Sequence, residues 1–212
     1  MHKIDPGLGR DKFFDILRKK KLLVKRRKKY VYTTDSFHRF RVYKNALKNK
    51  SLTRANQAWV SDITYLRVEG GFAYLFLITD AYSRKIIGWS LSDSLAIEGA
   101  IIALRMALKQ CAETKGIIHH SDRGIQYCSK EYVALLTKSS ITISMTEENH
   151  CYENSKAERV NGILKEEFLL DSEFADKKVA LKAVGEAIGT YNKKRPHWSL
   201  KLCTPEQVHL VA

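Results

Sequence analysis

The chain has 212 residues, of which 44% are hydrophobic and 28% are charged, so it can bury a core and is not wholly disordered. It contains no run of 18 apolar residues and its first residues lack the apolar core of a secretory signal, so we expect a cytoplasmic protein with no membrane partner. The four cysteines form no CxxC pair and no zinc-finger spacing with histidine, which predicts reduced thiols.

The net charge of +14 is concentrated near the N-terminus. Residues 1–50 hold 17 Lys and Arg against 4 Asp and Glu, whereas the rest of the chain is nearly neutral. This asymmetry indicates a polyanionic partner, most simply nucleic acid, although a solvated basic tail is the alternative. We expect a basic arm over residues 1–52, with a helix at residues 8–22 and a linker from residue 35, followed by a core over residues 53–212. The strongest run of cations in the arm is Lys25, Arg26, Arg27, Lys28 and Lys29.

Strands and helices alternate in the pattern of the core. Runs of strand-forming residues predict five strands, at residues 59–68, 72–79, 85–91, 117–120 and 141–144. Helical patterns predict helices at residues 95–111, 129–136, 153–169 and 176–194, with a last short helix from Thr204. This order predicts an α/β fold in which a mixed five-stranded sheet is flanked by helices.

Three carboxylates stand out as candidate site residues. Asp62 lies within the first predicted strand. Burying a carboxylate there costs free energy unless it pairs with a cation or binds a metal ion; the alternative is that it faces water on an edge strand. Asp122 follows the fourth strand, at the end where ligands gather in α/β sheets, although an Asx turn is the alternative. Glu158 shares a helix face with Asn161 and Lys165, which would otherwise be an ordinary solvated face.

Together the three acids can form a metal site. Hard cations such as Mg²⁺ prefer carboxylate oxygens, and two ions about 3.5–4 Å apart can bind the attacking and leaving oxygens of a phosphoryl transfer. The cations that flank the acids in sequence, and that would neutralise phosphates, are Arg123, Lys156 and Arg159. Asp80 ends the second predicted strand, and we expect it to organise the following turn instead.

At these residues the sequence resembles the DDE transposases of bacterial insertion sequences, specifically the insertion sequence three family. The resemblance is carried by residues 59–65, 119–127, 153–167 and 191–200, and by the 35 residues between Asp122 and Glu158. It implies a ribonuclease H-like core similar to that of retroviral integrase. It also implies that Asp62, Asp122 and Glu158 bind two Mg²⁺ ions, with Mn²⁺ as an alternative, and that Lys165 holds a DNA phosphate.

The implied activity is metal-dependent cleavage and transfer of DNA strands during transposition. The implied partners are transposon ends, target DNA and at least one further copy of the chain. Residues 7–18 resemble only the last part of the family's helical DNA-binding module, so we expect a second-reading-frame product with the first-frame product as a further partner. Two alternatives stay open: a catalytically silent regulatory fragment that binds DNA, and a ribonuclease H-like nuclease.

Overall fold

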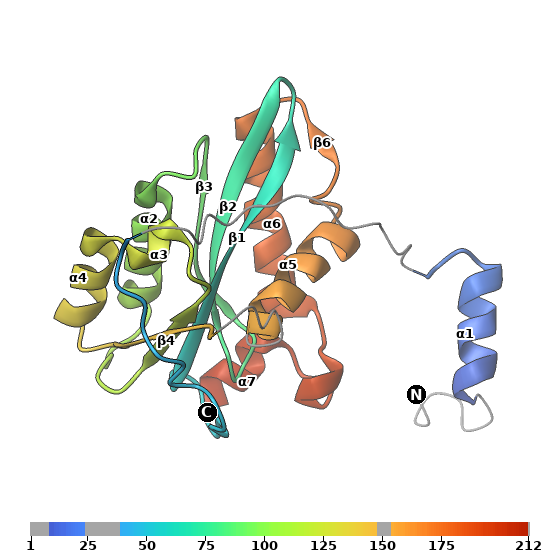
Figure 1. Cartoon of the computed structure of the whole chain (residues 1–212). Coiled ribbons are helices and arrows are strands. Elements are labelled where there is room, and N and C mark those ends of the chain that lie inside the picture. The colour runs from blue at the N-terminus through green and yellow to red at the C-terminus, as the bar shows by residue number, and fades with distance from the viewer. Residues whose placement is uncertain (1–8, 24–38, 148–153, 212) are drawn as a thin grey trace. The chain divides into compact units, whose positions relative to one another are not determined.

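The computed structural model describes residues 9–23, 39–147 and 154–211, and the chain divides into two compact units, residues 1–31 and 32–212 (Figure 1). In the first unit, helix α1 (Arg10–Lys19) lies within the predicted helical range and has no buried residue. Asp11 in its first turn and Arg18 and Lys19 in its last turn suit the helix dipole. The predicted cation run at residues 25–29 lies outside the described residues.

The second unit is built on a mixed sheet with the strand order β3-β2-β1-β4-β5. Strand β1 pairs antiparallel with β2 and parallel with β4, while β2–β3 is antiparallel and β4–β5 is parallel. The strand bounds are β1 (Ala58–Val68), β2 (Gly71–Asp80), β3 (Ile86–Ser92), β4 (Ile118–Ser121) and β5 (Thr142–Met145). The five predicted strands and the mixed sheet are therefore confirmed. A sixth strand, β6 (Glu173–Phe174), pairs with the end of β1 and is too short to show a pattern in the sequence.

Helices cover both faces of the sheet (Figure 1). Along β2, Phe76 and Ile78 face the core shared with the first group of helices, whereas Leu75 and Leu77 face the core shared with the second, as strand alternation requires. The first group is α2 (Ile97–Lys109), α3 (Ile125–Cys128) and α4 (Lys130–Lys138), and the second is α5 (Ser155–Glu167) and α6 (Lys177–Lys194). The chain continues through the 3₁₀ turn η2 (Trp198–Leu200) and helix α7 (Pro205–Val211). Among the described helices, none is both long and apolar enough to cross a membrane.

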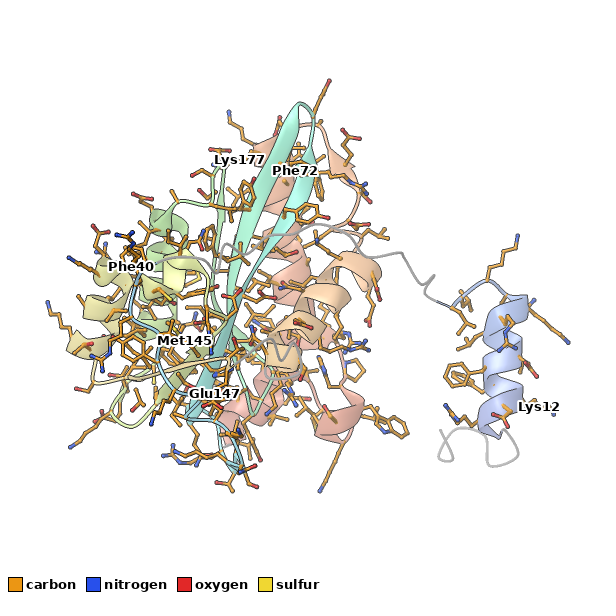
Figure 2. The ribbon with its side chains drawn as sticks, viewed as in Figure 1. Lys12, Phe40, Phe72, Met145, Glu147 and Lys177 are labelled. Carbon is orange, nitrogen blue, oxygen red and sulfur yellow. The ribbon has the colours of Figure 1, made fainter. Side chains whose placement is uncertain are left out.

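Part of the expected linker packs on the core. Ala46 and Leu47 join a small apolar cluster with the start of β1, and the Ala46 N–H donates to Ser144 Oγ over 2.8 Å. Lys48 Nζ lies 3.2 Å from a carboxylate oxygen of Glu147, which is labelled in Figure 2. Tertiary contacts that no local pattern reveals thus attach residues 46–48 of the expected linker to the sheet.

Candidate functional site

Two aspartates lie side by side where β4 ends. The parallel register pairs Val60 of β1 with His120 of β4; Asp62 lies two residues further along β1, and Asp122 is the first residue after β4. The negative charge of Asp122 acts on the pKa of Asp62, so the two carboxylates lie within electrostatic range. Asp122 Oδ1 also accepts the Gly124 N–H over 3.0 Å. Asp122 therefore forms the Asx turn that was the alternative interpretation, and it also lies close to Asp62, as expected for a site residue.

Asp62 is half-buried and accepts two hydrogen bonds. Its Oδ1 accepts the Ile63 N–H over 3.0 Å, and its Oδ2 accepts from Asn161 Nδ2 over 2.7 Å. Burial first, and then the negative charge of Asp122, raise the pKa of Asp62 to about 7, with a smaller contribution from Glu158 and against the effect of the two hydrogen bonds. A cation beside Asp62 and Asp122 would stabilise the ionised form of Asp62.

Helix α5 brings its polar face to Asp62. Asn161 binds Asp62 directly, and the charge of Glu158, in the first turn, acts on the same carboxylate. Asn154 Nδ2 donates to the Ser61 carbonyl over 3.0 Å and so ties the start of the helix to β1 beside Asp62. The structure therefore gathers Asp62, Asp122 and Glu158 in one region, with Glu158 the most exposed of the three.

Lys165 also reaches this region. Its Nζ lies 4.1 Å from the centroid of the Tyr65 ring, and Phe72 packs edge-on against the same ring. Phe72 lies near the tip of the β1–β2 hairpin (Figure 2). Burial lowers the pKa of Lys165 to about 8, while the nearby charge of Asp62 acts in the opposite direction. Lys165 is thus a half-buried cation held by an aromatic ring, which differs from a freely solvated lysine.

The other predicted phosphate contacts occupy different environments. Arg159 is exposed, whereas Lys156 is half-buried and its Nζ donates to the Ala81 carbonyl over 3.2 Å. Arg123 Nε donates to the Thr146 carbonyl over 2.8 Å. These bonds fix Lys156 and Arg123 locally, so Arg159 is the most accessible of the three.

The donor set fits a hard divalent cation. In the described part of the chain, no group of three or more His, Cys, Asp and Glu side chains is arranged to hold a metal ion. Mg²⁺, however, is usually held by one or two carboxylates with water and substrate phosphates, and Asp62 and Asp122 offer such a pair.

The nearby histidine and the described cysteines play other roles. His119 Nε2 lies 2.7 Å from Ser61 Oγ and 2.9 Å from the Tyr132 hydroxyl in the core, and burial, together with the charge of His120, lowers the pKa of His119 to about 3. His119 is therefore a neutral core residue. The described cysteines, Cys111, Cys128 and Cys203, are free thiols as expected, and Cys151 lies outside the described residues.

Sequence reasoning placed Asn161 on the face of Glu158 but gave it no role. The spacing of three residues between Glu158 and Asn161 indicates that they share a helix face. Only the tertiary structure shows that the Asn161 amide reaches Asp62. Asn154 carried no comparable signal, because its partner is a backbone carbonyl of a distant strand.

Comparisons with known proteins place this site in a family. The integrase core domain family matches residues 53–151, and a second integrase core domain family matches residues 139–205. An uncharacterized 31 kDa protein of insertion element IS600 from Shigella sonnei is 34% identical over 211 residues, covering 97% of this chain and 78% of that protein. Transposase InsF of insertion sequence IS3A from Escherichia coli is 34% identical over 193 residues, covering 90% of this chain and 67% of that protein.

The chain belongs to the IS3 family of transposases. The predicted enzyme class, a transposase with an integrase-like core, is thereby confirmed. Solved structures of retroviral integrase cores confirm the predicted ribonuclease H-like fold. The chain resembles the catalytic core of HTLV-2 integrase in complex with magnesium, with a TM-score of 0.58 and 22% identity over 74% of this chain and 97% of that one. It also resembles a chain of the simian T-cell lymphotropic virus intasome, with a TM-score of 0.63 and 20% identity over 81% of this chain and 58% of that one.

Proposed function

We propose that Asp62, Asp122 and Glu158 form the metal-binding active site with which this IS3-family transposase cleaves DNA strands and joins them to new phosphodiesters. The observation that carries the proposal is the proximity of Asp62, on β1, to Asp122, just after the end of β4: burial and this second carboxylate raise the pKa of Asp62 to about 7. When both are ionised, two partly buried carboxylates so close together destabilise the folded state unless a cation lies beside them.

Divalent cations are the cofactors that suit these oxygens. Asp62 and Asp122 would hold one ion, and Glu158, from the first turn of α5, would complete a site for two Mg²⁺ or Mn²⁺ ions. When bound, such ions lower the pKa of a nucleophilic water and stabilise the oxygen that leaves. A magnesium complex of the HTLV-2 integrase core, which shares the fold, supports this choice of ion.

The protein's own groups orient the acids and bind the substrate. The Asn161 amide donates to Asp62 Oδ2 and the Ile63 N–H donates to Oδ1, so the two bonds hold the orientation of this carboxylate. Lys165, held over the Tyr65 ring, binds a phosphate beside the acids, and exposed Arg159 neutralises another. The cations at residues 25–29 would bind the DNA backbone without reading its sequence.

The proposed substrates are the transposon ends and the target DNA. Bringing two ends together needs at least two copies of the chain, and the HTLV-2 integrase core has been described in dimeric and trimeric forms. The first-frame product of the element is a further proposed partner, because it would supply recognition of the ends.

The test is nicking and joining of labelled duplex DNA with Mg²⁺ or Mn²⁺ by the wild type, Glu158→Gln and Glu166→Gln. Glu166 is an exposed acid on the same helix, so its substitution is a matched control for the change of charge. We expect Glu158→Gln to lose about a thousandfold or more of the activity while DNA binding persists, and Glu166→Gln to remain active.

The outcomes separate the alternatives. Cleavage by Glu158→Gln at the wild-type rate would contradict the assignment of Glu158. DNA binding by the wild type with no cleavage in either metal would favour a regulatory fragment. Cleavage without any strand joining would favour a ribonuclease H-like nuclease.

A further inference from the structure

A tightly closed loop follows helix α6 at residues 197–203. The His197 N–H donates to the Cys203 carbonyl over 3.0 Å, and the Leu202 N–H donates to the His197 carbonyl over 2.9 Å. Lys201 and Leu202 are consecutive non-glycine residues with φ values of 54° and 66°. Left-handed backbone costs free energy for a branched side chain such as leucine, so the surrounding bonds must hold this shape.

The loop presents a tryptophan to solvent on a fixed support. Trp198 is 81% exposed, whereas Trp59 is fully buried in the core. The residue before Trp198, His197, is buried, and its ring stands edge-on to the Tyr191 ring with 5.1 Å between centroids. The Tyr191 hydroxyl in turn donates to the Arg84 carbonyl over 3.0 Å. A large exposed indole beside an anchored residue offers a flat surface at little further cost in conformational entropy.

The surroundings of Trp198 are positively charged. No Asp or Glu occurs between residues 187 and 205 of the sequence. Lys193, Lys194 and Lys201 are exposed, and within the described ranges none of them forms an ion pair. An exposed aromatic ring among cations suits a nucleic acid better than an apolar protein surface, because the lysines would remain solvated against the phosphates.

The loop is attached to the helix that carries Glu158. Arg195 forms two hydrogen bonds of 2.6 Å with the carboxylate of Glu167, in the last turn of α5. Glu158 and Glu167 are nine residues apart, which is about 13 Å along a helix, or about four nucleotides of a strand at 3.4 Å each. Burial lowers the pKa of His197 to about 4; the charges of Arg195, Arg84 and Arg159 act in the same direction, and the charge of Glu167 acts in the opposite direction. A DNA strand that passes the acids along α5 can therefore reach the end of this helix, where Glu167 binds Arg195, three residues before Trp198.

We propose that the loop at residues 197–203 binds an unpaired nucleotide of the DNA substrate, with the base stacked on the Trp198 indole and its phosphate beside Lys201. This inference rests on the proposed function, which supplies DNA as the substrate. Stacking requires a free base face, and the faces of bases within a duplex are covered by their neighbours. Stacking on an indole also tolerates any base, so the site selects an unpaired nucleotide without selecting its sequence.

The test compares binding of labelled single-stranded oligo(dT) and of a blunt duplex to the full chain in EDTA. Wild type, Trp198→Ala, Trp198→Phe and the control Ile102→Ala are measured, because Ile102 is an exposed apolar residue on α2, across the sheet from α6. We expect Trp198→Ala to weaken oligo(dT) binding about tenfold, Trp198→Phe to restore most of it, and duplex binding to change less than twofold. Oligo(dT) should also quench tryptophan emission in the wild type and not in Trp198→Ala.

Three results would overturn the proposal. The first is equal affinity of the wild type and Trp198→Ala for oligo(dT), and the second is an equal loss for oligo(dT) and duplex. The third is a loss of self-association in Trp198→Ala, measured by sedimentation, with unchanged oligo(dT) affinity, which would assign the loop to a protein interface. The binding assay contains no divalent cation and therefore does not depend on cleavage. A negative result for Trp198 in this assay is thus distinguishable from a failure of the proposed cleavage chemistry.

Discussion

Asp62 and Asp80 lie on the neighbouring strands β1 and β2 and differ in what surrounds them. Asp80 is fully buried, yet protein donors satisfy both of its oxygens. Its Oδ2 accepts the Asn56 N–H over 2.8 Å, and its Oδ1 accepts from the N–H groups of Tyr82 and Ser83 and from the Ser83 hydroxyl. Asp62 is less buried but accepts only two bonds and faces a second carboxylate.

Burial alone therefore does not distinguish a carboxylate that protein donors satisfy from one that a cation could bind. Asp80 accepts three hydrogen bonds from Tyr82 and Ser83 and so organises the turn after β2, as the sequence predicted, and it accepts a fourth from Asn56. Asp62 has Asp122 and Glu158 nearby, and its raised pKa shows that its ionised form is under-compensated by the protein. Under-compensated negative charge is what a cation site requires.

The largest expected effect is on activity at Asp62. Asp62→Asn keeps the shape of the side chain but removes the charge that would bind a cation, so we expect nicking to fall about a thousandfold or more. Its free energy of unfolding in EDTA should be no lower than that of the wild type. The nicking rate is measured on labelled DNA, and the free energy of unfolding is measured by urea denaturation. An unchanged nicking rate would contradict the assignment of Asp62 to the active site.

Asp80 should show the opposite behaviour. Asp80→Asn turns an amide NH₂ group toward backbone N–H donors in a buried turn, so we expect a loss of about 2–3 kcal/mol in the free energy of unfolding. Urea denaturation of Asp80→Asn beside Asp62→Asn measures the contrast. A destabilisation by Asp62→Asn as large as that by Asp80→Asn would break the distinction between the two carboxylates.

The pKa of Asp62 predicts how stability depends on pH. In the folded state Asp62 keeps its proton up to about pH 7, whereas an ordinary aspartate loses it near 3.8, so folding is favoured at low pH and this contribution is lost as the pH rises through 7. Relative to Asp62→Asn, the wild type should lose about 1–2 kcal/mol between pH 5 and 8 in EDTA, after allowance for partial exposure. Parallel pH dependence of the two proteins would contradict the raised pKa.

The smallest effect is expected at Asn161. Asn161→Ala removes a hydrogen bond that favours the ionised form of Asp62, so the pH at which activity appears should move upward and the rate at pH 7 should fall about fivefold. A pH–rate profile separates this positioning role from general damage, because loss of folded protein would lower the rate without moving the profile.

The sequence could predict most of the scaffold that carries the site. Strand-forming residues placed Asp62 within the first strand of the sheet, and helical spacing placed Asn161 and Lys165 on the face of Glu158. These inferences succeeded because periodicity is a local property.

Other features depend on tertiary contacts. Residues 46–48 looked like a linker because their partners, Ser144 and Glu147, are about a hundred residues away. Helix α3 has four residues and β6 has two, so neither is long enough to show a period. The Asn56 N–H that reaches Asp80 comes from a different loop, and the Asn161 amide that reaches Asp62 comes from a helix distant in the sequence, so no local spacing rule predicts either contact.

The most direct measurement of whether Asp62 serves a cation is thermal unfolding against Mg²⁺ concentration for the wild type, Asp62→Asn and Glu166→Gln. A ligand that binds only the folded state stabilises it by about 1.4 kcal/mol at ten times its dissociation constant. We predict that Mg²⁺ raises the melting temperature of the wild type and of Glu166→Gln, and leaves that of Asp62→Asn unchanged. An equal rise in all three proteins would contradict the assignment of the cation to Asp62.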